Sequence, residues 1–111
     1  MFVTKEYRKG KAIIRQGTHG TSAFILKKGT VEVFVENEMG EKKIIALLKE
    51  GDLFGEMAMV SNQTRGATVV ALEDCEVAIL TQEKFLELPD TNPAVLRIKK
   101  IMMERMKGKK G

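Results

Sequence analysis

Hydrophobic residues recur along the first eighty positions in short runs that alternate with polar residues and end near glycine. The clearest run is 31–36, where three valines share one face of an extended chain and Phe34 shares the other with two glutamates. This alternation is typical of a half-buried β-strand. The same reasoning predicts strands at 11–15, 23–26, 43–48, 67–72 and 76–80, with turns at the glycines between them.

Many short strands separated by glycine turns favour a sandwich or jelly roll, because these folds limit the exposed edges of a sheet. We therefore predict a mainly β fold, an antiparallel jelly-roll β-barrel (double-stranded β-helix) with short C-terminal helices. The β-roll is expected to occupy residues 1–80 of a single domain that spans residues 1–111.

Helical patterns occur only after this β region. A short helix is predicted over 82–88 with Thr81 as its N-cap, and a longer one over 92–107 with Asn92 as its N-cap and a proline in the first helical position. The longer helix carries a broad apolar stripe. This stripe either packs on the sheets of its own chain or pairs in part with a second copy to form a homodimer. The residues of the stripe are Val95, Leu96, Ile98, Ile101, Met102, Met103 and Met106.

Composition agrees with an ordinary globular protein, since 43% of the residues are hydrophobic and a chain of 111 residues can bury a core without disulfides or metals. No run of 18 apolar residues and no signal-peptide pattern occurs, so we expect no membrane span and a cytoplasmic location. One cysteine, Cys75, and one histidine, His19, are too few for a clustered metal site. We therefore expect no metal and no catalytic residues.

The net charge of +4 is concentrated near the C-terminus. Residues 97–110 contain seven lysines and arginines and one acid, whereas the rest of the chain has 12 basic and 14 acidic residues. A basic segment can attract nucleic acid or anionic membranes. The simpler interpretation is a solvated helix face.

One loop carries the groups that a small phosphorylated ligand needs. Within residues 54–58, Gly55 precedes a short helical segment whose free amides favour an anion, and Glu56 can accept a hydrogen bond from a ribose hydroxyl and also hold Arg65. The planar guanidinium of Arg65 can meet two phosphate oxygens. Taken alone, Glu56 and Arg65 could equally form a surface salt bridge. The candidate ligand-binding residues are Phe54, Gly55, Glu56, Met57, Ala58, Arg65, Gly66, Ala67 and Thr68.

Five motifs together resemble the cyclic nucleotide-binding domain family, of the catabolite activator protein, protein kinase A regulatory subunit and cyclic-nucleotide-gated channel type. The resemblance implies a cyclic nucleotide-binding regulatory (sensor) domain rather than an enzyme. Arg65 then takes the phosphate, Glu56 the ribose, and the 92–107 helix acts as lid or dimerisation helix. The motifs occupy 10–17 followed by Gly20, 24–33, 51–59, 65–69 and 75–80.

Two departures from the family pattern lie beside Arg65. Thr64 stands where the family often has proline, and Gly66 stands where it often has Ala, Ser or Thr. A hydroxyl at the second position tends to favour guanine, so its absence favours cyclic AMP over cyclic GMP as the regulatory ligand. Because 111 residues leave no room for a helix-turn-helix, no specific nucleic acid binding is expected from this chain. The alternative is a degenerate, ligand-free domain that serves as a dimerisation or protein-interaction module.

Overall fold

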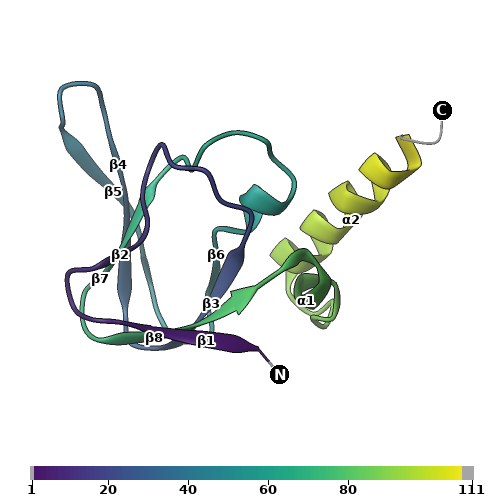
Figure 1. Cartoon of the computed structure of the whole chain (residues 1–111), viewed down its shortest axis with the longest axis horizontal. Helices are drawn as coiled ribbons and strands as arrows, with labels where there is room; N and C mark the ends of the chain where they lie inside the picture. The colour runs from purple at the N-terminus through teal and green to yellow at the C-terminus, as the bar shows by residue number, and fades with distance from the viewer. Residues whose placement is uncertain (1, 109–111) are drawn as a thin grey trace.

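Two four-stranded antiparallel sheets form the body of the protein in a computed structural model that describes residues 2–108, and the side chains of residues 2–105 (Figure 1). One sheet has the order β1-β8-β3-β6, with strands Val3–Tyr7, Cys75–Leu80, Ala23–Lys28 and Leu53–Phe54. The other has the order β2-β7-β4-β5, with strands Ala12–Ile14, Thr68–Ala71, Val31–Glu36 and Lys42–Leu48.

The mainly β, antiparallel fold predicted from the alternation is confirmed, but the two sheets do not close into one barrel. β1 and β6 remain the edges of one sheet, and β2 and β5 remain the edges of the other. Two strands, β1 and β6, were not predicted. β1 alternates weakly and is exposed along most of its length, and β6 has only two residues.

The valine face of β4 points inward as predicted. Val31 is fully buried and Val33 packs against the same core, while Phe34 on the opposite face is covered by the ammonium group of Lys42 at 4.4 Å from the ring centroid. The pairing of β4 with β5 contains a β-bulge, because Val33 pairs with Ala46 and Phe34 with Ile44. Ile45, which lies between Ile44 and Ala46, is therefore left without a paired residue on β4.

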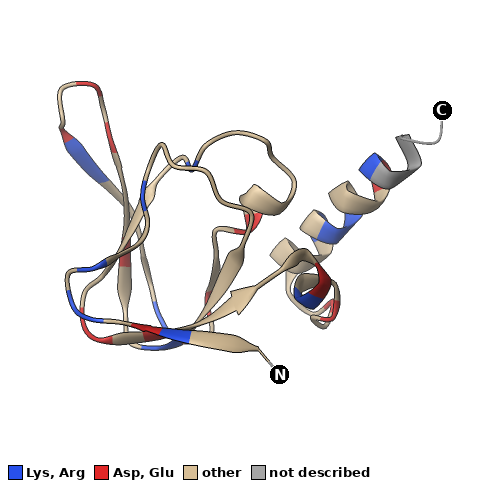
Figure 2. Cartoon of the chain, viewed as in Figure 1, with Lys and Arg blue, Asp and Glu red and all other residues tan. Residues whose placement is uncertain are grey.

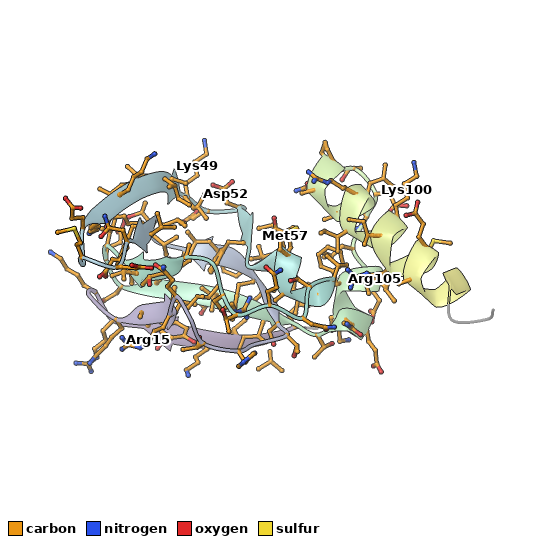
Figure 3. The ribbon with its side chains drawn as sticks, turned by 90° about the horizontal axis from the view of Figure 1, so that it is seen from above. Arg15, Lys49, Asp52, Met57, Lys100 and Arg105 are labelled. Atoms are coloured by element: carbon orange, nitrogen blue, oxygen red, sulfur yellow. The ribbon has the colours of Figure 1, made fainter. Side chains whose placement is uncertain are left out.

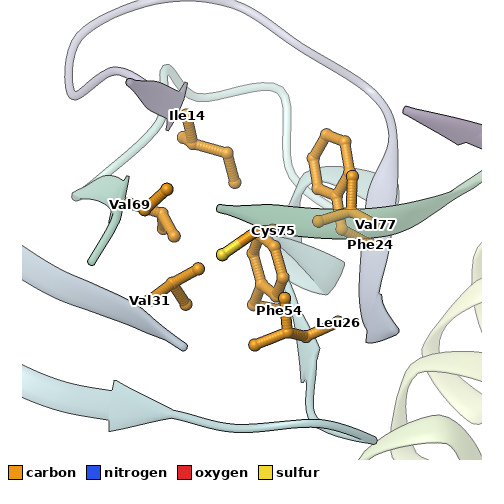
Figure 4. Packing of buried hydrophobic residues seen from close by; sticks show 9 residues of the cluster. Ile14, Phe24, Leu26, Val31, Phe54, Val69, Cys75 and Val77 are labelled. Carbon is orange, nitrogen blue, oxygen red and sulfur yellow. The ribbon is translucent and has the colours of Figure 1, made fainter. Parts of the chain in front are cut away.

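The first core cluster fills the space between the sheets (Figure 4). Phe24 and Phe54 stack within it, with ring centroids 5.3 Å apart. The lone cysteine belongs to this cluster as a buried free thiol, as its apolar sequence context suggests. The buried members are Ile14, Phe24, Leu26, Val31, Phe54, Val69, Ala71, Cys75 and Val77.

A second core cluster joins the sheets to the helical segments. These segments are η1, a 3-10 helix over Glu56–Met59, and the α-helices α1 over Gln82–Leu86 and α2 over Pro93–Gly108. Each of these segments contributes residues to the cluster, and η1 is packed between the sheets and α2 (Figure 3). The buried members of the second core cluster are Ala23, Met59, Val60, Leu80, Phe85, Val95 and Ile98.

Both predicted helix caps form. The Thr81 hydroxyl accepts a 3.2 Å hydrogen bond from the backbone N–H of Lys84, and the Asn92 side chain accepts one of 2.8 Å from Ala94. α2 begins one residue after the predicted boundary and ends one residue beyond it. The helix projects away from the sheets, with its C-terminal end far from them (Figure 1).

The apolar stripe of α2 is only partly covered. Val95 and Ile98 are buried, Ile101 and Met102 are half-buried, and Leu96 and Met103 are 48% and 58% exposed. Met106 lies outside the described side chains. The chain's own packing therefore covers Val95 and Ile98 and leaves Leu96 and Met103 largely in solvent.

Charged residues are spread over both sheets, and lysines and arginines recur along α2 (Figure 2). Arg97, Lys100 and Arg105 are exposed there, which agrees with a solvated face. Lys99 differs, because its ammonium group donates to the carbonyl oxygen of Leu88 at 2.5 Å and pairs with Asp90 at 2.7 Å. Within residues 2–108, no helix has both the length and the apolar character that a membrane span requires.

Candidate functional site

A cavity of about 430 Å³ lies beside the predicted loop and receives residues from both sheets, η1 and the segment that follows it. Its floor is apolar, formed by the inward faces of β2, β4, β6 and β7. Polar residues of the 61–66 segment complete its wall. The lining residues are Ile14, Val33, Ile45, Phe54, Gly55, Met57, Ala58, Ser61, Gln63, Thr64, Arg65, Gly66, Ala67 and Val69.

Gly55 shapes the start of the site. It adopts a left-handed conformation, with φ of 73° and ψ of 9°, and η1 begins at the next residue. This conformation is costly for residues with a Cβ atom. A Cβ at this position would also lie 3.0 Å from Cδ1 of Ile14 and 3.2 Å from Nη1 of Arg65. Glycine is therefore required here both by the turn and by the space.

Arg65 is held by two backbone carbonyl groups. Its Nη1 donates to the oxygen of Gly55 at 3.0 Å, and its Nη2 donates to the oxygen of Ser22 at 2.9 Å. The guanidinium carbon lies 5.9 Å from the centroid of the Phe24 ring. Burial lowers the pKa of the Arg65 side chain, but an arginine begins so far above neutrality that it stays charged. A fixed cation therefore stands at the cavity wall.

The backbone of Arg65 is fixed as well. Its N–H donates to the carbonyl of Thr18, and its carbonyl accepts from the N–H of Gly17, both at 2.8 Å. The turn after β2 thus anchors the residue that carries the positive charge. Gln16 continues this anchoring, because its backbone N–H donates to the hydroxyl of Thr68 at 3.0 Å and its side-chain amide pairs with the backbone of Glu36.

The cavity brings together seven of the nine candidate residues, namely Phe54, Gly55, Met57, Ala58, Arg65, Gly66 and Ala67. The other two, Glu56 and Thr68, do not line it. Thr68 is turned to Gln16. Glu56 is half-buried in the first turn of η1 and makes no ion pair with Arg65, whose partners are carbonyl oxygens instead.

Sequence reasoning missed the apolar cavity residues that come from β2, β4, β5 and β7, namely Ile14, Val33, Ile45 and Val69. Val33 could have been found, because it lies on the predicted inward face of β4. Ile45 could not, because it is the extra residue of the β-bulge and its orientation depends on the register of β4 and β5. Up to residue 105, where the described side chains end, no residue of α1 or α2 lines the cavity.

Comparison with known proteins gives one consistent result. Residues 4–92 match the family described as "Cyclic nucleotide-binding domain". The Cyclic AMP receptor protein of Thermus thermophilus is 36% identical over 94 residues, which cover 85% of this chain and 44% of that protein. The cAMP-activated global transcriptional regulator CRP of Salmonella typhimurium is 33% identical over 103 residues, covering 91% and 49%. The chain thus spans about half the length of these relatives.

Solved structures agree. The Thermus thermophilus Catabolite Activator Protein superimposes with a TM-score of 0.75 at 32% identity, covering 97% of this chain and 51% of that one. The structure described as cAMP-bound PfPKA-R (141-441) superimposes with a TM-score of 0.73 at 33% identity, covering 81% and 32%.

Proposed function

Because the chain belongs to the cyclic nucleotide-binding domain family, we propose that its cavity binds cyclic AMP as a regulatory ligand. The resemblance seen in the motifs is confirmed, and the chain is a cyclic nucleotide-binding regulatory domain. The observation that carries the proposal is the Arg65 guanidinium, fixed by two carbonyl groups at the wall of the cavity. A volume of about 430 Å³ falls within the range of pockets that hold one small ligand.

Each part of the ligand has a counterpart in the site. Arg65 neutralises the single phosphodiester charge, and the backbone around Gly55 and Ala58 and around Gly66 and Ala67 approaches the phosphate closely. The Val33 and Ile45 side chains offer apolar surface to the base. The Glu56 carboxylate accepts a hydrogen bond from the ribose 2′-hydroxyl once the side chain turns toward the cavity. Such a turn requires no break in an existing ion pair with Arg65, because Arg65 uses carbonyl partners.

The preference for cyclic AMP over cyclic GMP rests on Gly66, which lines the cavity without a hydroxyl group. Two relatives support it, because one is a cyclic AMP receptor protein and the other a cAMP-activated regulator. The ligand is a sensor signal and not a substrate, and we propose no enzymatic activity and no metal for this chain. Among the described residues, no group of three or more metal-binding side chains occurs.

Ligand capture can reach α2 through η1. Met57 and Ala58 of η1 line the cavity, while Met59 belongs to the second core cluster together with Ile98 of α2. A ligand that pulls η1 toward the cavity therefore moves the surface on which α2 rests. We propose that this shift brings α2 over the open side of the cavity as a lid, driven by tighter ligand binding to the closed state.

The exposed apolar residues Leu96 and Met103 support a second role of α2, as the contact of a homodimer. The segments that we propose as functional units are the β-roll of residues 1–80, the short helix of 82–88 and the lid or dimerisation helix of 92–107, within one domain of 1–111 in the cytoplasm. A ligand-free dimerisation or protein-interaction module is the alternative, and nucleic acid contacts of this chain are proposed to be nonspecific.

Isothermal titration calorimetry of the wild-type chain with cyclic AMP and cyclic GMP tests the proposal. We expect saturable binding of both, with cyclic AMP tighter. No heat and no thermal shift with either ligand at millimolar concentration would favour the ligand-free module. Sedimentation at high micromolar concentration tests the dimer, and a monomer at that concentration removes it.

A further inference from the structure

Gly20 lies in the turn between β2 and β3, and its backbone does not explain why it is glycine. It is absent from the glycines with positive φ. In contrast, the space around it is occupied, because a Cβ built on Gly20 would lie 2.7 Å from Nη2, 2.9 Å from Nε and 3.1 Å from Cζ of Arg65. The two distances below 3.0 Å are shorter than real Cβ contacts, so no side chain fits while Arg65 keeps its place.

The three distances also say where the missing Cβ would lie. It would be almost equally far from Nε and Nη2 and farther from Cζ. This is the place in front of the fork formed by the two nitrogens on one edge of the guanidinium. This edge of the guanidinium therefore faces the backbone of Gly20. A methyl group at position 20 would overlap the edge and push the guanidinium away from its two carbonyl partners.

The two carbonyl contacts of Arg65 use only part of its hydrogen-bond donors. The bonds from Nη1 to Gly55 and from Nη2 to Ser22 use two of the five N–H groups of the guanidinium. Three N–H groups, including that of Nε, make no hydrogen bond to another described residue. The guanidinium is thus fixed in orientation without being saturated.

We propose that Gly20 is a positioning residue for the ligand phosphate: its lack of a side chain lets Arg65 reach both carbonyl groups, which fixes the orientation in which the guanidinium meets the phosphate. This inference rests on the proposed function of Arg65. It concerns a residue that does not itself line the cavity. Its effect on binding is exerted entirely through the orientation of Arg65.

Gly20→Ala should act on binding and leave folding almost unchanged. The atoms that a Cβ would meet belong to the end of a flexible side chain, so Arg65 can swing aside without a backbone shift. Gly40→Ala is the matched control, because it should affect folding and leave ligand binding unchanged. Gly40 has a φ of 79° and nothing within 4 Å of its missing Cβ, in the hairpin turn between β4 and β5. Alanine there strains the backbone and touches no ligand group.

Calorimetry with cyclic AMP on wild type, Gly20→Ala, Gly40→Ala, Arg65→Ala and the double variant Gly20→Ala/Arg65→Ala separates the roles. We expect Gly20→Ala to lose affinity about 10- to 100-fold, the range of one charge-assisted hydrogen bond, with a thermal midpoint close to wild type. Gly40→Ala should keep its affinity and lower the midpoint. In the Arg65→Ala background, Gly20→Ala should change the affinity less than about twofold.

A second measurement follows Arg65 without ligand. The Nε–H resonance of Arg65 in ¹⁵N spectra should shift in Gly20→Ala and stay in place in Gly40→Ala. The inference is overturned if Gly20→Ala binds like wild type, or if its loss persists in the Arg65→Ala background. If wild type itself binds no cyclic nucleotide, the proposed function fails and this inference fails with it, whereas wild-type binding with an unaffected Gly20→Ala removes only the role of Gly20.

Discussion

The carbonyl oxygen of Gly55 accepts a 3.0 Å hydrogen bond from Nη1 of Arg65, so the N-cap residue of η1 also orients the cation of the site. One glycine thereby couples the geometry of the 3-10 helix to the geometry of the guanidinium. A shift of η1 would therefore move a hydrogen-bond partner of Arg65, and a shift of the guanidinium would act on the residue that precedes η1.

Removing the cation is the most direct test of the site. Arg65→Ala should weaken cyclic AMP binding by about 2–5 kcal/mol, the scale for losing one partner of a buried charge pair. Arg65→Lys should recover little, because an ammonium group lacks the planar fork that reaches the Gly55 and Ser22 carbonyls together. Calorimetry measures both. Wild-type affinity in Arg65→Ala would contradict the assignment of the phosphate to this residue.

Gly55→Ala should damage folding and binding at once. The left-handed backbone costs about 1–2 kcal/mol for a residue with a Cβ, and that Cβ would also press on Ile14 and Arg65. Gly51→Ala is the matched control, because Gly51 has a φ of 92° and nothing within 4 Å of its missing Cβ. Both variants should lower the midpoint of thermal unfolding, but only Gly55→Ala should also lower cyclic AMP affinity. Equal affinities in the two variants would count against the contact with Arg65.

Some features of the fold and of the site could be predicted from the sequence, and others could not. The alternation of 31–36 identified β4 and its inward valines, because period-two burial depends on neighbouring residues alone. Arg65 was found from its residue type, but its carbonyl partners Ser22 and Gly55 were not, since the first lies 43 positions away. The position of Ile45 follows from a register shift, which the strand sequence does not encode locally.

Lys99 should stabilise the connection between α1 and α2. Its ammonium group bonds the Leu88 carbonyl, just beyond the end of α1, and pairs with Asp90. Lys99→Met keeps the apolar stem and removes the charge, and we expect a loss of about 1 kcal/mol, discounted for the exposure of Asp90. Thermal unfolding should show a midpoint about 4 °C lower. Lys100→Met, at an exposed position that points away from the sheets in Figure 3, should leave the midpoint unchanged.

Cys75 should make the protein less stable at high pH. Burial raises the pKa of its thiol, with smaller opposing effects from hydrogen bonds to the Glu73 and Thr30 carbonyls. Because the pKa is raised in the folded state, the contribution of the neutral thiol to the free energy of unfolding is complete below the ordinary thiol pKa. It is lost as pH rises through the pKa of the folded state. Denaturant unfolding from pH 7 to 10 should therefore show a steeper alkaline loss in wild type than in Cys75→Ala. Parallel curves would refute the role of the thiol.

Native Cys75 should also react slowly with thiol reagents. Its side chain is 4% exposed, and the thiolate that reacts is disfavoured by burial. Modification of Cys75 at neutral pH should require unfolding. We therefore expect 4 M urea to accelerate this modification far more than it accelerates that of a small-molecule thiol. Rapid labelling of the folded protein in buffer would show that the thiol is accessible and would contradict the packing around it.

The attachment of α2 to η1 should depend on Ile98, which is 2% exposed in the second core cluster. Ile98→Ala leaves a cavity between α2, η1 and α1, and the expected cost is about 2–5 kcal/mol in the free energy of unfolding. Leu96→Ala on the same helix removes a side chain that is 48% exposed and should cost much less. If α2 merely rested on the domain, both variants would unfold at the wild-type midpoint. A loss in Ile98→Ala alone, together with faster amide exchange along α2, would show that η1 holds the helix and can therefore move it.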